Sequence, residues 1–137
     1  MFESLSPVVQ SGMIYTGANV NLVYGSDHEF IVFRAPKTCK IVGLRTWSNA
    51  AVSAGTLQVS FINKGTALAG STTISTHGTA VAYAADTPAE ETVSAGALTE
   101  GEYVSLVLSN RSSGTTVALN GFGWQFDIVY GKPAGLG

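Results

Sequence analysis

One histidine lies between two carboxylates at Asp27, His28 and Glu29, the only local group with the residue types of a metal or acid–base site. A metal site needs three or four ligands that converge on one point. Consecutive residues at the start of a strand point alternately to opposite faces, so His28 is directed away from both carboxylates. We therefore expect no metal site here, only an ordinary role at the beginning of a strand.

Two carboxylate pairs, Glu90 with Glu91 and Glu100 with Glu102, have the residue type used in glycoside hydrolysis and in calcium binding. The first pair lies beside a proline-containing loop, and the second pair flanks a turn glycine, Gly101. Neither pair has the regularly spaced acidic residues of a calcium-binding loop. We expect all four to be solvated loop acids.

A serine or threonine nucleophile needs a base, and the sequence contains two histidines, His28 and His77. Neither belongs to a nucleophile motif such as Gly-x-Ser-x-Gly. We predict that the chain is not an enzyme and has no catalytic, cofactor-binding or metal-binding residues. Replacing either histidine by alanine should then change stability no more than an ordinary surface substitution does.

The sequence is poor in charge. Charged residues make up 12% of it, whereas about 25% is usual in soluble proteins. Gly, Ala, Ser, Thr and Asn must cover much of the surface, and these residues repel neighbouring proteins poorly. This composition favours close contact with other chains. The formal net charge of −2, without clustered Lys and Arg, predicts no nucleic-acid partner.

The location of the protein can also be predicted from the sequence. No run approaches the ~20 apolar residues of a membrane-spanning helix. The first residues carry Glu3 instead of a basic region and lack the continuous apolar stretch of a secretory signal. We expect a protein made in a cytoplasm, with no membrane partner.

Alternating apolar and polar residues mark the strands most clearly at residues 57–61 and 122–130. This period of two is typical of a strand with one buried face. Trp124 and Phe126 belong to the second stretch and are expected to supply much of the core. Cys39, the only cysteine, is expected to be a small buried residue.

Further strands are expected along the rest of the chain, within residues 12–24, 28–34, 41–47, 66–68, 71–76, 91–94, 98–110 and 116–119. Residues 78–90 are interpreted as mostly loop. About eight strands with turns at near-regular spacing indicate an all-β domain, a single antiparallel β-sandwich or barrel. We place this domain at residues 12–131, between an N-terminal arm at 1–11 and a C-terminal tail at 132–137.

The strand at residues 41–47 is less regular than the others. Its alternation predicts Ile41, Arg45 and Trp47 on one face and Leu44 on the other. We expect Trp47 to be a core residue beside the sheet. The alternative is an exposed platform on which a sugar stacks.

The arm at residues 1–11 contains apolar residues without a clean period of two or 3.6. Terminal segments are usually mobile unless something holds them. We expect this arm to be extended and to contact a partner chain. The candidate contact residues are Phe2, Leu5, Pro7, Val8 and Val9.

Two stretches resemble the jelly-roll domains of tailed-phage virion proteins: residues 43–68, GLRTWSNAAVSAGTLQVSFINKGTAL, and residues 98–110, LTEGEYVSLVLSN. The shared features are a strand that ends in an Arg-x-Trp-like step, a polar turn, and a strand that ends in Asn-x-Gly. A later strand with a leucine, a turn glycine and an acidic residue follows. The likeness covers about residues 28–130. It implies a jelly-roll sandwich and a component of a virion.

Within this group, the small single-domain capsid decoration (cement) proteins are most similar in size, in having an apolar arm and in lacking enzyme residues. The resemblance implies a structural protein on a phage capsid surface, made in the host cytoplasm, which binds major capsid subunits as a homotrimer. Tail-fibre and receptor-binding jelly rolls share the same strands, so a carbohydrate- or receptor-binding module is the alternative. Exposed aromatic residues such as Trp47, Tyr83 or Tyr103 would favour that alternative.

Overall fold

The computed structural model of the chain describes residues 7–17, 19–78 and 82–131. All regular secondary structure in these residues is β-strand. The strands are β1 (Val8–Ile14), β2 (Val20–Leu22), β3 (Asp27–Arg34), β4 (Cys39–Ser48), β5 (Leu57–Gly65), β6 (Thr72–His77), β7 (Ala89–Glu91), β8 (Ala97–Leu98), β9 (Tyr103–Asn110), β10 (Val117–Leu119) and β11 (Phe122–Tyr130).

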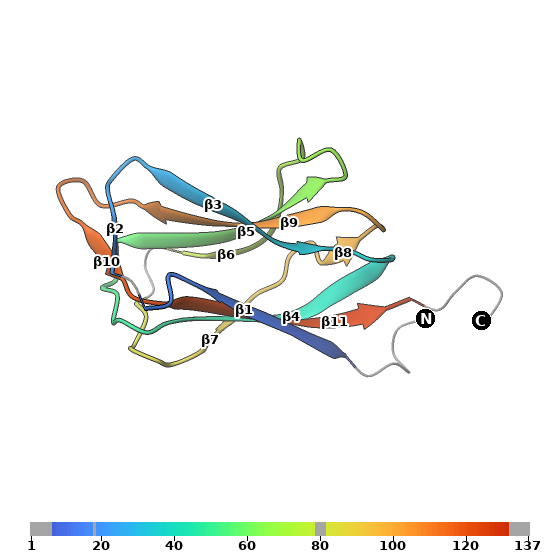
Figure 1. The fold of residues 1–137 in the computed structure, drawn as a ribbon, viewed down its shortest axis with the longest axis horizontal. Helices are drawn as coiled ribbons and strands as arrows, with labels where there is room; N and C mark the ends of the chain where they lie inside the picture. The colour runs from blue at the N-terminus through green and yellow to red at the C-terminus, as the bar shows by residue number, and fades with distance from the viewer. Residues whose placement is uncertain (1–6, 18, 79–81, 132–137) are drawn as a thin grey trace.

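The main strands form two antiparallel sheets that pack face to face (Figure 1). One sheet has the order β1-β11-β4-β7, with the short β8 also paired to β4, and the other has the order β3-β9-β5-β6. These two strand orders are those of a double-sheet jelly roll. Strands β2 and β10 pair separately at one end of the sandwich. The predicted fold class is confirmed.

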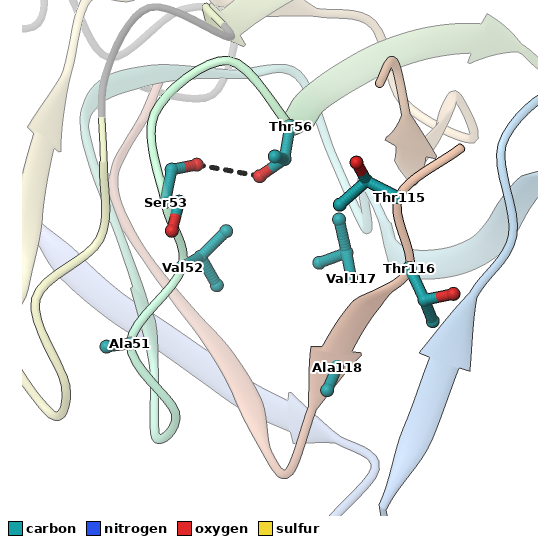
Figure 2. A pocket seen from close by; sticks show the side chains of 8 residues that line it. All are labelled: Ala51, Val52, Ser53, Thr56, Thr115, Thr116, Val117 and Ala118. Atoms are coloured by element: carbon teal, nitrogen blue, oxygen red, sulfur yellow. Dashed lines mark hydrogen bonds between the residues drawn. The ribbon is translucent and has the colours of Figure 1, made fainter. Parts of the chain in front are cut away.

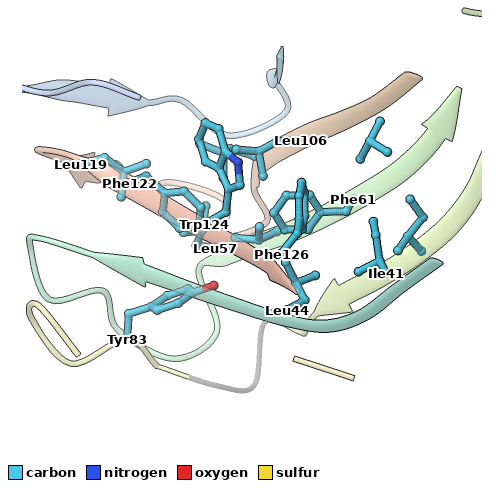
Figure 3. Packing of buried hydrophobic residues seen from close by; sticks show 14 of the residues in the cluster. Ile41, Leu44, Leu57, Phe61, Tyr83, Leu106, Leu119, Phe122, Trp124 and Phe126 are labelled. Carbon is cyan, nitrogen blue, oxygen red and sulfur yellow. The ribbon is translucent and has the colours of Figure 1, made fainter. Parts of the chain in front are cut away.

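The core lies between the two sheets and is built around the inner face of β11 (Figure 3). Trp124 is 7% exposed and Phe126 is fully buried, so both predicted core residues are confirmed. The ring of Phe126 lies 5.3 Å from that of Phe61 on the opposite sheet, in the edge-to-face geometry that aromatic pairs prefer. Cys39 is buried, as predicted.

The two faces of β4 differ from the prediction because a β-bulge interrupts this strand. The register of β4 against β11 shifts beside Gly43 and leaves Val42 without a partner in the ladder. An extra residue of this kind reverses the alternation of side chains beyond it. Ile41 therefore shares the buried face with Leu44, and Trp47 lies on the outer face. The prediction that Ile41 and Trp47 share a face is wrong.

Strand β1 begins at Val8, so residues 8–11, which the sequence assigned to an extended arm, form the first half of an edge strand. The strand pairs with β11 from Val8 opposite Ile128 to Ile14 opposite Phe122. In the described part of the chain, no strand pairs with the other edge of β1.

Two short segments differ from the prediction, and a third agrees with it. Residues 66–68 form a turn in place of the expected strand, and Leu68 adopts a positive φ of 61°. Strand β7 ends at Glu91, where a strand over 91–94 was expected to begin. The described part of 78–90 is loop up to β7, as predicted, and a bridge between Val52 and Tyr83 ties it to the β4–β5 connection.

Candidate interaction surfaces

The residues first considered for chemistry at the start of β3 have separate partners. His28 Nδ1 lies 2.9 Å from the hydroxyl of Tyr15, and Glu29 Oε2 lies 3.5 Å from Lys64 Nζ. Asp27 opens the ladder opposite Ser109. Across the described ranges, no three His, Cys, Asp or Glu side chains are grouped closely enough to hold a metal ion.

The carboxylate pair around Gly101 belongs to a turn. Glu102 Oε1 accepts hydrogen bonds from the backbone N–H of Thr99 at 2.7 Å and from Asn63 Nδ2 at 3.3 Å. Glu100 is exposed. These contacts give Glu102 a structural role in closing the turn between β8 and β9.

Glu91 and His77 are buried together, contrary to the prediction for each. His77 Nδ1 lies 2.7 Å from Glu91 Oε2, and the two side chains are 3% and 7% exposed. Strand β6 turns His77 toward the core, and β7 brings Glu91 to the same place beside β4. The predictions that Glu91 is a solvated loop acid and that His77 behaves as a surface residue are wrong.

Thr46 and Tyr83 extend this contact into a buried polar network. Thr46 Oγ1 donates to Glu91 Oε2 and accepts from the Tyr83 hydroxyl at 2.7 Å. The Tyr83 ring stacks on His77 with centroids 4.1 Å apart. Burial raises the pKa of Tyr83 well above its usual value, so its hydroxyl remains a donor. The network joins β4 and β7 of one sheet to β6 of the other.

The geometry of this network indicates that it stabilises the fold. His77 Nε2 is buried and has no hydrogen-bond partner among the described residues. Neither His77 nor Glu91 is among the residues that line the two pockets described below. The pair joins β6 of one sheet to β7 of the other and so holds the sheets together, and Tyr83, at 2% exposed, is too buried to act as an exposed sugar platform.

The first interaction surface is the open edge of β1. Val8 and Val9 point to opposite faces of the strand, and they are 45% and 54% exposed. Pro7 is exposed as well, whereas Phe2 and Leu5 lie outside the described residues. Of the five predicted contact residues, the three that the structure describes are therefore accessible at this edge.

The second surface is the outer face of the same sheet around Trp47. The indole is half-buried and covers Gly123 of β11, where a Cβ atom would overlap the ring. The expectation that Trp47 packs in the core is wrong, because it does not belong to the buried cluster between the sheets. Tyr103 is also half-buried, and the guanidinium of Arg34 lies 5.8 Å from its ring centroid.

Arg45 forms a polar network beside Trp47. Its Nε donates to Glu90 at 2.6 Å, and its Nη1 donates to Asp127 at 3.0 Å and to Gln125 at 3.1 Å. The hydrogen bond to Asp127, followed by that to Glu90, raises the pKa of Arg45. The guanidinium is thus fixed in orientation, and two carboxylates neutralise its charge.

Trp47 and this network border an open pocket of about 260 Å³. It is lined by Arg45, Trp47, Asn49, Asp86, Pro88 and Gln125. The backbone N–H of Asn49 donates to Gly121 at 2.9 Å, and that of Asp86 donates to Ser48 at 2.8 Å. These bonds attach both loop residues to the ends of the central strands.

A second pocket, of about 270 Å³, lies between the β4–β5 connection and β10 (Figure 2). Its lining consists of small side chains: Ala51, Val52, Ser53, Thr56, Thr115, Thr116, Val117 and Ala118. The Thr56 hydroxyl donates to the Ser53 carbonyl at 2.7 Å, and the Thr115 hydroxyl accepts from Ser112 at 3.2 Å. With no aromatic or charged side chain in its lining, this pocket offers little to orient a ligand.

Of the residues that line the Trp47 pocket, sequence reasoning identified only Trp47 as a possible binding residue; it missed Arg45, Asn49, Asp86, Pro88 and Gln125. The position of Gln125 could have been found, because it opposes Arg45 in the ladder and both face outward. Asp86 could not have been found, because it comes from a loop whose place is set by a bridge between Ser48 and Ala85.

Comparison with known proteins leaves the chain unassigned: no protein-family model and no curated protein matches it. In the described part of the chain, no helix is long and apolar enough to cross a membrane.

Proposed function

We propose that this chain is a structural virion protein that decorates and stabilises a phage capsid by binding major capsid subunits, as a homotrimer on the capsid surface. Three features support the proposal: the resemblance of residues 43–68 and 98–110 to phage jelly rolls, the low content of charged residues, and the open edge of β1.

The observation that carries the proposal is the position of Val8 and Val9 on β1. A strand residue normally has one face turned to the core, yet these neighbours point to opposite faces and both are exposed. The first half of β1 therefore extends beyond the cover of the opposite sheet. An exposed apolar edge of this kind favours pairing with another chain.

A segment of a capsid subunit that pairs along β1 would both form hydrogen bonds with its free backbone groups and cover its exposed valines. Its backbone would pair with the N–H and C=O groups that β11 does not use, as in strand addition. Its side chains would cover the two valines, and each valine buried contributes about 1.5 to 3 kcal/mol before the costs of association.

Replacing both valines by lysine, Val8→Lys with Val9→Lys, should weaken attachment to undecorated particles by about 100-fold or more, the equivalent of losing ~3 kcal/mol. The free protein should remain folded, because both positions are exposed and lysine is common on edge strands. The measurement is particle occupancy as a function of added protein, together with thermal unfolding of each free variant.

Val23→Lys is the matched control, since Val23 is 61% exposed in the turn after β2, away from β1. Occupancy should not change with this variant. A third variant that lacks residues 2–7 keeps β1 whole and tests Phe2, Leu5 and Pro7 separately. Unchanged occupancy of the double lysine variant would exclude β1 from attachment.

We also expect self-association, most simply as a trimer, because a surface rich in Ser, Thr and Ala costs little to bury. The measurement is multi-angle light scattering after size exclusion, with the free protein at tens of micromolar and with the particle-bound form after release. A monomer under both conditions would contradict the trimeric arrangement.

A further inference from the structure

We propose that the Trp47 pocket on the outer face of β4 and β11 binds one uncharged sugar ring of a glycan. This binding role goes beyond the assembly role of β1 and uses different side chains.

The combination of groups in the pocket matches the chemistry of a sugar. A pyranose ring has an apolar face of C–H groups and an edge of hydroxyls that both donate and accept hydrogen bonds. Trp47 offers a half-buried indole against which the apolar face can lie. The amides of Asn49 and Gln125 and the carboxylate of Asp86, all from the lining, supply donors and acceptors around it.

The local charge favours an uncharged ring over an acidic one. Arg45 is the only cation in the lining, and it is already paired with Glu90 and Asp127. Asp86 adds a further negative charge at the rim. Together, Glu90, Asp127 and Asp86 outnumber the single guanidinium of Arg45, so an anionic sugar, a phosphate or a nucleic acid would meet a net negative charge, which disfavours such a ligand.

The size and rigidity of the pocket fit one ring. Its volume of about 260 Å³ is slightly below the ~300 to 1,000 Å³ of sites for drug-sized ligands, which suits a single monosaccharide unit of a longer chain. Trp47 is held against Gly123, Gln125 is held by Arg45 at 3.1 Å, and backbone hydrogen bonds to Gly121 and Ser48 fix the loops that carry Asn49 and Asp86. Because the indole, the Gln125 amide and the two loop backbones are already in place, binding them to a ligand requires less ordering.

The two tryptophans make a direct experiment possible. Each indole N–H gives its own signal in a ¹H–¹⁵N spectrum, and Trp47→Phe assigns the signal of Trp47. The labelled protein is titrated with neutral disaccharides of glucose, galactose and N-acetylglucosamine, and with sialyllactose as an acidic probe. The Trp47 signal should shift saturably with at least one neutral probe, and that of buried Trp124 should not. Absence of any such shift up to ~20 mM, where a Kd of about 1 mM would be near saturation, would overturn the proposal. A shift with sialyllactose alone would overturn it too.

Variants then locate the site. Trp47→Ala should weaken binding of the responding disaccharide by ~10-fold or more, and Asn49→Ala with Gln125→Ala by a similar factor. The second variant keeps the indole, so it tests the pocket even if the loss of Trp47 perturbs the fold. Tyr24→Ala, which removes an exposed aromatic ring in another turn, is the matched control and should bind normally. Equal affinity in the control and both pocket variants would place the site elsewhere and overturn the proposal.

Discussion

Phe126→Ala should lower the free energy of unfolding by about 3 to 5 kcal/mol, the range for a fully buried phenylalanine. Phe126 is 0% exposed on β11, and its ring contacts one ring from each of two opposite strands: Phe61 at 5.3 Å and Phe33 at 6.1 Å. Removal of the ring leaves a cavity between the sheets that the neighbouring strands cannot fill without moving. Trp124→Ala should act in the same direction, because its indole packs against Gly12 of β1.

Denaturant titration of each variant measures this effect. Phe126→Leu, which keeps most of the volume, should cost clearly less than Phe126→Ala. Tyr24→Ala serves as the surface control and should change stability by no more than about half a kcal/mol. A loss for Phe126→Ala as small as that of the control would mean that the sheets do not pack through this ring.

The parts of the fold that could be predicted are those in which burial and strand periodicity agree. In residues 122–128, Phe122, Trp124, Phe126 and Ile128 alternate with smaller or polar residues, and these apolar side chains face the core. Residues 57–61 behave in the same way in β5. A strand with one buried face leaves its period in the sequence, because every second side chain must be apolar.

The outer face of β4 could not be predicted because a single bulge reverses the face to which the side chains on either side of it point. The sequence around Gly43 is compatible with an unbroken strand, and only the pairing with β11 shows that Val42 is the additional residue. Asp127 occupies the space beside Gly43 that a side chain would fill. Trp47 was therefore expected in the core, whereas it lies beside Arg45 on the outer face.

The buried network was missed for a different reason. Adjacent glutamates after a proline-containing loop are typical of a solvated segment. The sequence does not show that the strand containing Glu91 pairs with β4. Burial of Glu91 is possible only because His77, from a strand on the other sheet, and Thr46 supply hydrogen bonds to it. Such a long-range arrangement leaves no local pattern.

The two proposed surfaces belong to one sheet but can be tested independently. β1 lies at its edge, whereas Trp47 lies on β4, with β11 between the two strands. Lysine at Val8 and Val9 should therefore leave the Trp47 indole signal responsive to sugar. Conversely, Trp47→Ala should leave particle occupancy unchanged if β1 alone carries attachment.

The buried pair of His77 and Glu91 is expected to matter as much to stability as the largest core rings. His77→Ala should lower the free energy of unfolding by about 3 to 5 kcal/mol, the usual cost of removing one partner of a buried pair. The substitution would remove a hydrogen-bond donor from a carboxylate that is 7% exposed, and would also remove the ring stacked on Tyr83. Glu91→Gln, which keeps the shape of the side chain but not its charge, should cost less than His77→Ala.

Denaturant unfolding of single and double variants distinguishes a coupled pair from two independent residues. If His77 and Glu91 act together, His77→Ala with Glu91→Ala should cost less than the sum of the two single substitutions, because each single variant already removes their contact. Glu90→Gln is the matched control: Glu90 is adjacent in sequence but its side chain is 71% exposed, so stability should change by no more than about half a kcal/mol. A change as small as this for His77→Ala would contradict the buried pair and restore the surface role that the sequence suggested.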